Sequence, residues 1–332
     1  MLIVESYPLA VAMCVVTMLC WGSWANTQKL ASSEWQFQLF YWDYSLGVLL
    51  LTLALAFTIG SMGEQGRSFM ADITQASPEA LTSALIGGAL FNFANILLVV
   101  AIDIAGMAVA FPVAIGMALV IGVVSNYMAT PVGDAALLFT GVGLVTLAIV
   151  LDAVIYKRLP DDGNKSMGKG LTISIICGFA MGFFYRFVAA SMSFDFAAPE
   201  AGLMTPYSAG VVFSVGLLVS NIVFLVPLMY KPISGEVAPA GEYFSKGTPR
   251  LHLVGIFGGV IWALGFSLNI IAAGSAGYAI SYGLGQGATM VAAFWGVFIW
   301  KEFKDAPEGT NSLIGAMFIL FFIGLGLIIY SR

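Results

Sequence analysis

Long hydrophobic runs, separated by short polar breaks, follow one another along the whole chain. Each run has about 20 residues, the length that a helix needs to cross the hydrocarbon core of a bilayer. The first run is longer than a signal-peptide core and continues into Trp21 and Trp24, so we expect it to be retained. The pattern predicts an all-α integral membrane protein with ten transmembrane helices, near residues 7–28, 38–60, 80–102, 105–127, 133–156, 169–191, 206–230, 250–274, 277–300 and 309–331.

The composition is incompatible with a soluble fold. Hydrophobic residues make up 60% of the 332 positions and charged residues only 9%, which leaves too little polar surface to cover a water-soluble protein. The sequence contains no phosphate-binding loop and no hydrolase or kinase nucleophile motif. We therefore expect no cofactor, no nucleic-acid partner and no ATP-driven pumping within this chain.

Residues 87–122 reappear without a gap at 258–293, which is 171 positions later. Nine of the 36 aligned positions are identical, and small residues recur at every fourth position in both copies. Such ladders let helix backbones approach closely, so helix packing is favoured over a direct role in lining a solute path. The matched ladders are Gly106, Ala110, Ala114, Ala118 and Gly122 in the first copy and Gly277, Ser281, Gly285, Thr289 and Ala293 in the second.

The two copies lie five predicted helices apart, an odd number, so they should cross the membrane in opposite directions. This predicts two inverted five-helix halves, residues 1–156 and 169–332, joined by a short basic linker, residues 157–168. Inverted repeats are a recurring construction of secondary transporters, in which the solute binds near the bilayer midplane and the halves alternate between two open states.

Basic residues gather in the breaks after the first, fifth, seventh and ninth runs, which together hold ten lysines and arginines. The opposite side has only Arg67 and Arg332, while Arg186 falls within the sixth run. By the positive-inside rule the basic breaks, including the linker 157–168, should be cytoplasmic, which places both termini outside. We expect a multi-pass plasma-membrane protein surrounded by lipid, either a monomer or a homodimer.

Three short segments carry a resemblance to a known family. They are Tyr-Trp-Asp-Tyr-Ser at 41–45, Ala-Gly-Tyr-Ala at 276–279, and Phe-Trp-Gly at 294–296 followed by Trp-Lys-Glu-Phe at 300–303. In these segments the chain resembles the plant ureide permeases of the drug/metabolite transporter superfamily. More loosely it resembles the glucose/ribose porters and the L-rhamnose/proton symporters, whose third span often carries Gly-Asn where this chain has Ala94 and Asn95.

The resemblance implies ten spans in two inverted halves and proton-coupled uptake of allantoin, uracil and related neutral heterocycles. The porters imply sugars instead, and export of drugs or metabolites is the third alternative within the superfamily. Plant ureide permeases carry a long cytoplasmic loop between the halves, whereas residues 157–168 form a short polar linker here. The short linker favours a bacterial form in the inner membrane.

Asp43, near the start of the second run with Tyr41 and Tyr44 beside it, is the best candidate for binding a coupling proton. Partial burial would let such a carboxyl group take up and release a proton near physiological pH. The alternative is a carboxylate that interacts with the helix dipole at the amino-terminal end of the span. Asp103 and Asp152 are expected to be interfacial.

Amide side chains within the runs are the main candidates for solute binding, because lipid offers them no hydrogen bonds. Asn95 and Trp262, which lies in the repeat-related helix, would present an amide beside an aromatic platform. This arrangement suits a small planar or ring-shaped polar solute. Asn92 and Asn269 are candidates of the same kind, and hydrogen bonding between helices is the alternative for each asparagine.

Five further positions complete the candidate solute site: Tyr185, Arg186, Tyr282, Gln286 and Trp24. Arg186, which follows Tyr185 deep in the sixth run, either faces a cavity or extends its long side chain to the interface. Tyr282 and Gln286 in the ninth run are one helical turn apart and share a face. For Trp24 an aromatic belt at the membrane interface is the simpler interpretation.

Reactive side chains are few. Cys14, Cys20 and Cys177 lie inside apolar runs and are expected to be packing residues with no disulfide or metal role. His252, the single histidine, has no partner in the sequence with which it would form a triad or a metal site. A membrane enzyme is therefore disfavoured, and inverted halves favour a carrier over a channel.

Overall fold

The computed structural model describes residues 1–31, 34–159 and 167–332, so residues 160–166 of the predicted linker lie outside it. Within these ranges ten helices are long and apolar enough to cross a membrane, which confirms the predicted all-α fold. The helices are α1 (Tyr7–Ser23), α2 (Ala25–Ala31), α3 (Phe37–Phe57), α4 (Phe69–Gln75), α5 (Pro78–Ala105), α6 (Met107–Ala129), α7 (Ala135–Tyr156), α8 (Met167–Ser191), α9 (Pro206–Tyr230), α10 (Gly241–Ser245), α11 (Pro249–Ala276), α12 (Tyr278–Gly285), α13 (Ala288–Phe294), the π-helix η1 (Trp295–Ile299) and α14 (Thr310–Tyr330).

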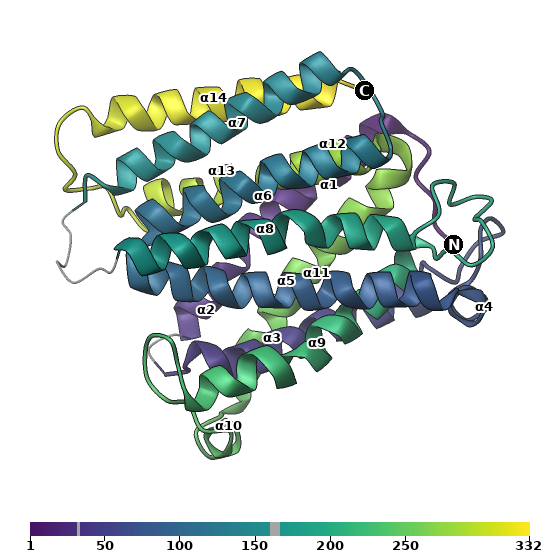
Figure 1. The fold of residues 1–332 in the computed structure, drawn as a ribbon, viewed down its shortest axis with the longest axis horizontal. Coiled ribbons are helices and arrows are strands. Elements are labelled where there is room, and N and C mark those ends of the chain that lie inside the picture. The colour runs from purple at the N-terminus through teal and green to yellow at the C-terminus, as the bar shows by residue number, and fades with distance from the viewer. Residues whose placement is uncertain (32–33, 160–166) are drawn as a thin grey trace.

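The two chain ends lie at the same end of the helix bundle, together with α4, and α10 lies at the opposite end (Figure 1). We call the end with residues 1–6 and 331–332 the terminus side. The other end, where α7 ends and α8 begins, is the linker side. Helices α7 and α14 pack together along one flank, while α3 and α9 lie at the other (Figure 1).

Helices α5 and α11 have the same length and the same ends, displaced by 171 positions. Each has 28 residues and starts with a proline, after a Ser77 or Thr248 side chain that caps the first turn. Each ends at a glycine with a positive φ, 79° at Gly106 and 88° at Gly277. A left-handed backbone angle favours glycine because it has no Cβ, so both copies require glycine at the turn into the next helix.

Related packing surrounds these two helices. Helix α5 packs mainly on α8 and α9, and α11 packs mainly on α1 and α3. A Cβ atom on Gly88 would come within 2.0 Å of the Phe213 carbonyl oxygen, and one on Gly259 would come equally close to the Tyr44 carbonyl oxygen. Because both glycines allow direct contact between backbones, neither position tolerates a side chain without separating the helices.

Helices α3 and α9 contact each other through two reciprocal hydrogen bonds. Thr52 Oγ1 donates to Ser214 Oγ over 3.0 Å, and Asn221 Nδ2 donates to Ser45 Oγ over 2.9 Å. The early part of each helix thus meets the late part of the other, so the two helices run antiparallel. Exchanged contacts between corresponding positions are expected of elements related by a two-fold axis. The inverted repeat stays a prediction, and these contacts favour it.

Two of the predicted spans contain an irregular turn. It lies at Trp24 between α1 and α2 in the first span, and at Gln286 and Gly287 between α12 and α13 in the ninth, which continues as η1. The backbone stays in the right-handed helical region at all three positions, so each span crosses the membrane as one helix. Two of the candidate site residues, Trp24 and Gln286, lie at these irregular turns.

Small and sulfur-containing side chains fill the contacts between helices, as expected. Ala110, Ala114 and Ala118 of the first ladder are fully buried, and Gly122 lies against the Tyr282 ring. All three cysteines are buried and free. These positions are part of the packing that holds the spans together.

Candidate functional site

An amide and two tyrosines meet between α3, α5 and α11. Asn95 Nδ2 donates to the Tyr41 hydroxyl over 3.1 Å, and the Tyr41 ring stacks on Tyr44 with 5.0 Å between centroids. Trp24 lies 4.8 Å from the Tyr44 ring and Trp262 lies 6.4 Å from it, between ring centroids. Asn95, Tyr41 and Tyr44 are buried, and the Tyr44 hydroxyl has no hydrogen-bond partner among the described residues. We call these five residues the amide–tyrosine cluster.

Aromatic rings occupy the centre of the bundle beside this cluster. Phe91 and Trp262, which are equivalent in the two copies, lie 4.3 Å apart between ring centroids. Phe213 stacks on Phe266 at the same centroid distance and on Trp262 at 5.9 Å. Trp21 stacks on Trp262 and donates its indole N–H to the Trp262 carbonyl oxygen. The rings separate the amide–tyrosine cluster from the polar groups nearer the terminus side.

A second polar group lies on the other side of these rings. Asn269 Nδ2 donates to the Ser281 carbonyl oxygen over 2.7 Å, and the Tyr185 hydroxyl lies 3.0 Å from Ser281 Oγ. The Tyr282 hydroxyl lies 3.2 Å from the carbonyl oxygens of Ala118 and Met181. The structure thus divides the predicted solute residues into two groups, and Tyr185, Asn269 and Tyr282 connect helices.

The remaining candidates lie apart from both groups. Asn92 Nδ2 donates to Ser220 Oγ and Asn221 Oδ1 of α9, which is the interhelical bonding predicted as its alternative role. Arg186 is half-buried near the terminus-side end of α8, where its positive charge lies near the Tyr278 hydroxyl. Gln286 is buried in the ninth span, and its backbone N–H donates to the carbonyl oxygen of Tyr282 one turn earlier.

Asp43 is part of a polar cluster on the linker side. Its side chain is 1% exposed, and both carboxylate oxygens lie 3.0 Å from His252 Nδ1. The Tyr243 hydroxyl donates to Oδ1 of the same carboxylate. Burial and the neighbouring carboxylate raise the pKa of Tyr243 above its usual value, so this hydroxyl keeps its proton and stays a donor.

Two expectations about this cluster were wrong. His252 has a partner after all, because α11 brings it to a carboxylate 209 positions away in the sequence. Asp43 does not lie in the first turn of α3, whose N-cap is Gln36, so interaction with the helix dipole is not its role. The lone histidine and the lone carboxylate of the second run gave no signal of this pairing in the sequence.

The terminus side is closed by a different set of charges. Arg67 Nε lies 2.9 Å from Asp72 Oδ1, while Asp72 Oδ2 accepts hydrogen bonds from the backbone N–H and the hydroxyl of Thr205. The Arg67 guanidinium also donates to the carbonyl oxygens of Pro199, Glu200 and Leu203. Asp72 is fully buried. This Arg67–Asp72 clasp ties α4 to the start of α9, and no local pattern in the sequence indicates it.

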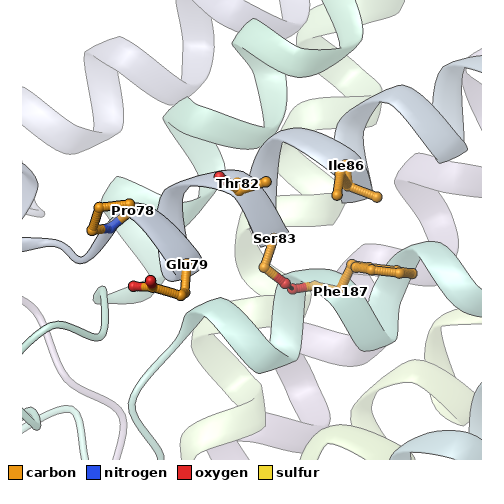
Figure 2. Close-up of a pocket in the computed structure, with 6 residues that line it drawn as sticks. All are labelled: Pro78, Glu79, Thr82, Ser83, Ile86 and Phe187. Carbon is orange, nitrogen blue, oxygen red and sulfur yellow. Dashed lines mark hydrogen bonds between the residues drawn. The ribbon is translucent and has the colours of Figure 1, made fainter.

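One surface hollow is lined by none of the predicted site residues, although its Phe187 follows Arg186 in the sequence. It has a volume of about 340 Å³ and is open, lined by the start of α5 and by Phe187 of α8 (Figure 2). A smaller one, of about 20 Å³, lies on the linker side and is lined by Phe37, Ile96 and Leu225 among others. It adjoins the amide–tyrosine cluster, because the Phe37 ring lies 5.1 Å from Tyr41. Its volume holds about one water molecule.

Comparisons with known proteins agree with the resemblance. The ureide permease family matches residues 40–169 and 164–331. Ureide permease 5 of Arabidopsis thaliana is 22% identical over 402 aligned positions, covering 99% of this chain and 95% of the relative. Ureide permease 4 of the same plant is also 22% identical and covers 100% and 99%. These alignments exceed the 332 residues of this chain, so the plant proteins carry additional residues.

Two further comparisons extend this result. A probable ureide permease, A3 of Vigna unguiculata, is 25% identical over 169 positions and covers about half of each chain, 49% and 45%. A crystal structure of a protein with 14% sequence identity has a TM-score of 0.60 and covers 97% of this chain and 96% of its own, which shows a shared fold. With the family matched across both halves, this multi-pass membrane protein belongs to the ureide permease family.

Proposed function

We propose that this protein is a secondary transporter that takes up a small, neutral, polar solute of the ureide or nucleobase kind. The observation that carries the proposal is the amide–tyrosine cluster, a buried amide beside stacked rings with one unpaired hydroxyl. An amide both donates and accepts hydrogen bonds, and the Tyr44 hydroxyl is free to form a hydrogen bond with a solute. A ureide or nucleobase is flat and carries alternating N–H and C=O groups, so it matches both features. The names of the relatives support the same solute class.

Asn95, Trp262, Trp24 and Tyr44 are the proposed solute-binding residues. Gln286 also contacts the solute in this proposal, when the solute reaches the turn between α12 and α13. Asn92, Tyr185, Asn269 and Tyr282 serve packing in this proposal, because they lie outside the amide–tyrosine cluster and each bonds to a neighbouring helix. Arg186 extends towards the terminus-side interface, where its charge meets water and lipid headgroups.

The proposed transport cycle is alternating access between inverted halves, driven by the proton gradient through Asp43. The reciprocal contacts of α3 and α9 support related halves. Polar bonds at both ends of the bundle support a state in which the solute site is closed to both sides. We place the linker side in the cytoplasm and both termini outside, because of the basic residues at the linker side.

Uptake into proteoliposomes tests the proposal. Radiolabelled allantoin and uracil should accumulate when the outside is acidic, and preloaded unlabelled solute should stimulate exchange. Asn95→Ala should raise KM about tenfold, the value of one or two lost hydrogen bonds. Asn311→Ala, an exposed amide at the start of α14, is the matched control and should leave KM unchanged.

Other outcomes would contradict the proposal in different ways. Transport of glucose or ribose without allantoin or uracil would identify a sugar porter. Flux that is linear in concentration and shows no exchange would identify a channel. Export against the proposed direction would identify a metabolite exporter.

A further inference from the structure

On the linker side, one polar cluster joins three separate elements. Asp43 comes from α3, Tyr243 from the short helix α10 and His252 from the first turn of α11. The carboxylate is buried, whereas 26% of the His252 side chain is exposed, so the imidazole can exchange a proton with water. The Trp35 indole packs edge-on against the imidazole at 5.3 Å and covers the cluster from the chain segment before α3.

The two ends of the bundle are closed by equivalent elements with different chemistry. Helix α4 precedes α5 as α10 precedes α11, and Asp72 and Tyr243 differ by the same 171 positions as the repeat. Asp72 bonds to the start of α9, while Tyr243 bonds to Asp43 of α3. The linker-side contact contains an imidazole, whose charge can change within the physiological pH range, whereas the terminus-side contact contains an arginine, which keeps its charge.

We propose that Asp43 and His252 bind the coupling proton together, and that the protonated pair keeps the linker side shut. With the proton bound, an imidazolium and a carboxylate form an ion pair without net charge. After the proton leaves to the linker side, a buried carboxylate is held by two neutral donors, the imidazole N–H and the Tyr243 hydroxyl. The remaining bonds are still charge-assisted through the carboxylate, but the ion pair is lost, and a buried carboxylate without a counter-charge favours contact with water. Release of the proton thus favours separation of α10 and α11 from α3.

Other charges near the cluster have counter-charges of their own. On α10, Glu242 pairs with Lys246 at 2.8 Å, and Arg250 of α11 pairs with Glu34 at 3.1 Å. Lys29 of α2 pairs with Glu302 at 2.9 Å. The hydroxyl of Tyr230 on α9 accepts the backbone N–H of Ala240. Tyr41 and Tyr44 of α3 belong to the amide–tyrosine cluster. Among these groups, His252 contacts the Asp43 carboxylate directly, and it carries a positive charge only when it is protonated.

The same helix contact joins the proton pair to the proposed solute site. Gly255 of α11 lies against Asp43, where a Cβ atom would come within 2.5 Å of the Asp43 Cβ. One turn further, Gly259 meets the Tyr44 backbone, and Trp262 follows on the same helix. Separation of α11 from α3 at His252 must therefore shift Trp262 relative to Tyr44. This inference rests on the proposed transport function, which supplies the solute and the proton gradient.

His252→Gln tests the proposal, since glutamine keeps a hydrogen-bonding side chain that cannot gain a charge. In proteoliposomes the variant should lose the response of uptake to an imposed pH gradient by at least about tenfold. Exchange at equal pH should stay within about twofold of the unchanged protein. Arg250→Gln, which removes a neighbouring cation with its own exposed partner, is the matched control and should keep the full response.

A second measurement reports closure directly. Leu251→Cys, buried beside His252 in the first turn of α11, is labelled with a maleimide at pH 6 and pH 8, and its labelling rate is divided by that of the exposed Glu308→Cys. In the otherwise unchanged protein the ratio should rise several-fold from pH 6 to pH 8, and His252→Gln should abolish this rise. Tyr243→Phe, which removes one donor, should raise the ratio at pH 6 about tenfold.

The outcomes separate the two proposals. A pH-gradient response and a labelling ratio in His252→Gln equal to those of the unchanged protein would overturn the shared proton site. If Tyr243→Phe also leaves the labelling ratio unchanged, closure by this cluster is refuted even where His252→Gln does not fold. Absence of any saturable solute exchange in the unchanged protein would instead refute the transport function.

Discussion

Breaking the Arg67–Asp72 clasp should open the terminus side of the bundle. The perturbation is Asp72→Asn, which keeps the size of the side chain but replaces a carboxylate oxygen by an NH2 group. Asp72 is fully buried and accepts hydrogen bonds from Arg67 and from two Thr205 groups. An amide oxygen still accepts one or two of these bonds, but the NH2 group faces donors and the ion pair is lost.

The structure sets the size of the effect. Removing one partner of a buried ion pair costs about 3–5 kcal/mol. We expect the lower value, about 3 kcal/mol, because the Arg67 side chain is 22% exposed and keeps carbonyl acceptors after the change. If the clasp exists only in the state closed on this side, the ratio of open to closed protein rises by up to about 150-fold.

The assay is the labelling rate of a cysteine at Ser208, one turn inside Thr205 on α9. Ser208 is fully buried, and the three native cysteines are buried as well. A maleimide should label Ser208→Cys at least about tenfold faster in the Asp72→Asn background, since opening exposes this face of α9. Glu79→Gln removes an exposed carboxylate at the same end of the bundle and should leave the rate unchanged.

The reasoning is wrong if Asp72→Asn and Glu79→Gln give the same labelling rate in folded protein. A lower melting temperature of Asp72→Asn without faster labelling would mean that the clasp stabilises the fold as a whole and does not select the closed state.

Two further substitutions test the amide–tyrosine cluster and the contact between α3 and α11. Tyr44→Phe removes a buried hydroxyl without a partner, so it should stabilise the solute-free protein by about 1 kcal/mol and weaken solute binding about tenfold. Thermal unfolding with and without allantoin measures both effects, and weaker stability with unchanged binding would contradict this role. Gly259→Val places a side chain against the Tyr44 carbonyl oxygen and should abolish transport with a loss of about 3 kcal/mol. Gly315→Val, which faces open space on α14, is its control; equal activity of the two variants would refute close α3–α11 contact.

The spans and their repeat could be predicted from the sequence because both depend on local pattern. The length of an apolar run decides whether a helix crosses the bilayer. The 171-residue repeat is retained in the bounds of α5 and α11, down to the capping side chains Ser77 and Thr248. The irregular turns at Trp24 and Gln286 were not predicted, because hydropathy reports the length of a span and not its local hydrogen bonding.

Contacts between distant spans could not be predicted in the same way. Asn92 and Asn95 are three positions apart on α5, yet one bonds to α9 and the other to α3. Helical spacing places side chains on one face, but the neighbouring helix that each meets depends on tertiary packing. The pairing of Asp43 with His252 is the extreme case, because neither residue has a local pattern that points to the other.

The repeat also shows why the proposed solute site lies to one side of the central rings. The packing of α3 and α9 relates Tyr41 to Gly210 and Tyr44 to Phe213, and the 171-residue repeat relates Asn95 to Phe266. The polar cluster on one side of the rings thus has an apolar counterpart on the other, where Phe213 and Phe266 stack 4.3 Å apart. A solute bound by Asn95 and Tyr44 is therefore separated from the terminus side by these rings and from the linker side by Phe37 and the proton-binding pair. Opening towards the termini must displace stacked aromatic rings, whereas opening towards the linker must break the contact between Asp43 and His252. In the proposed cycle the proton therefore acts on the opening towards the linker, while the stacked rings set the barrier to opening towards the termini.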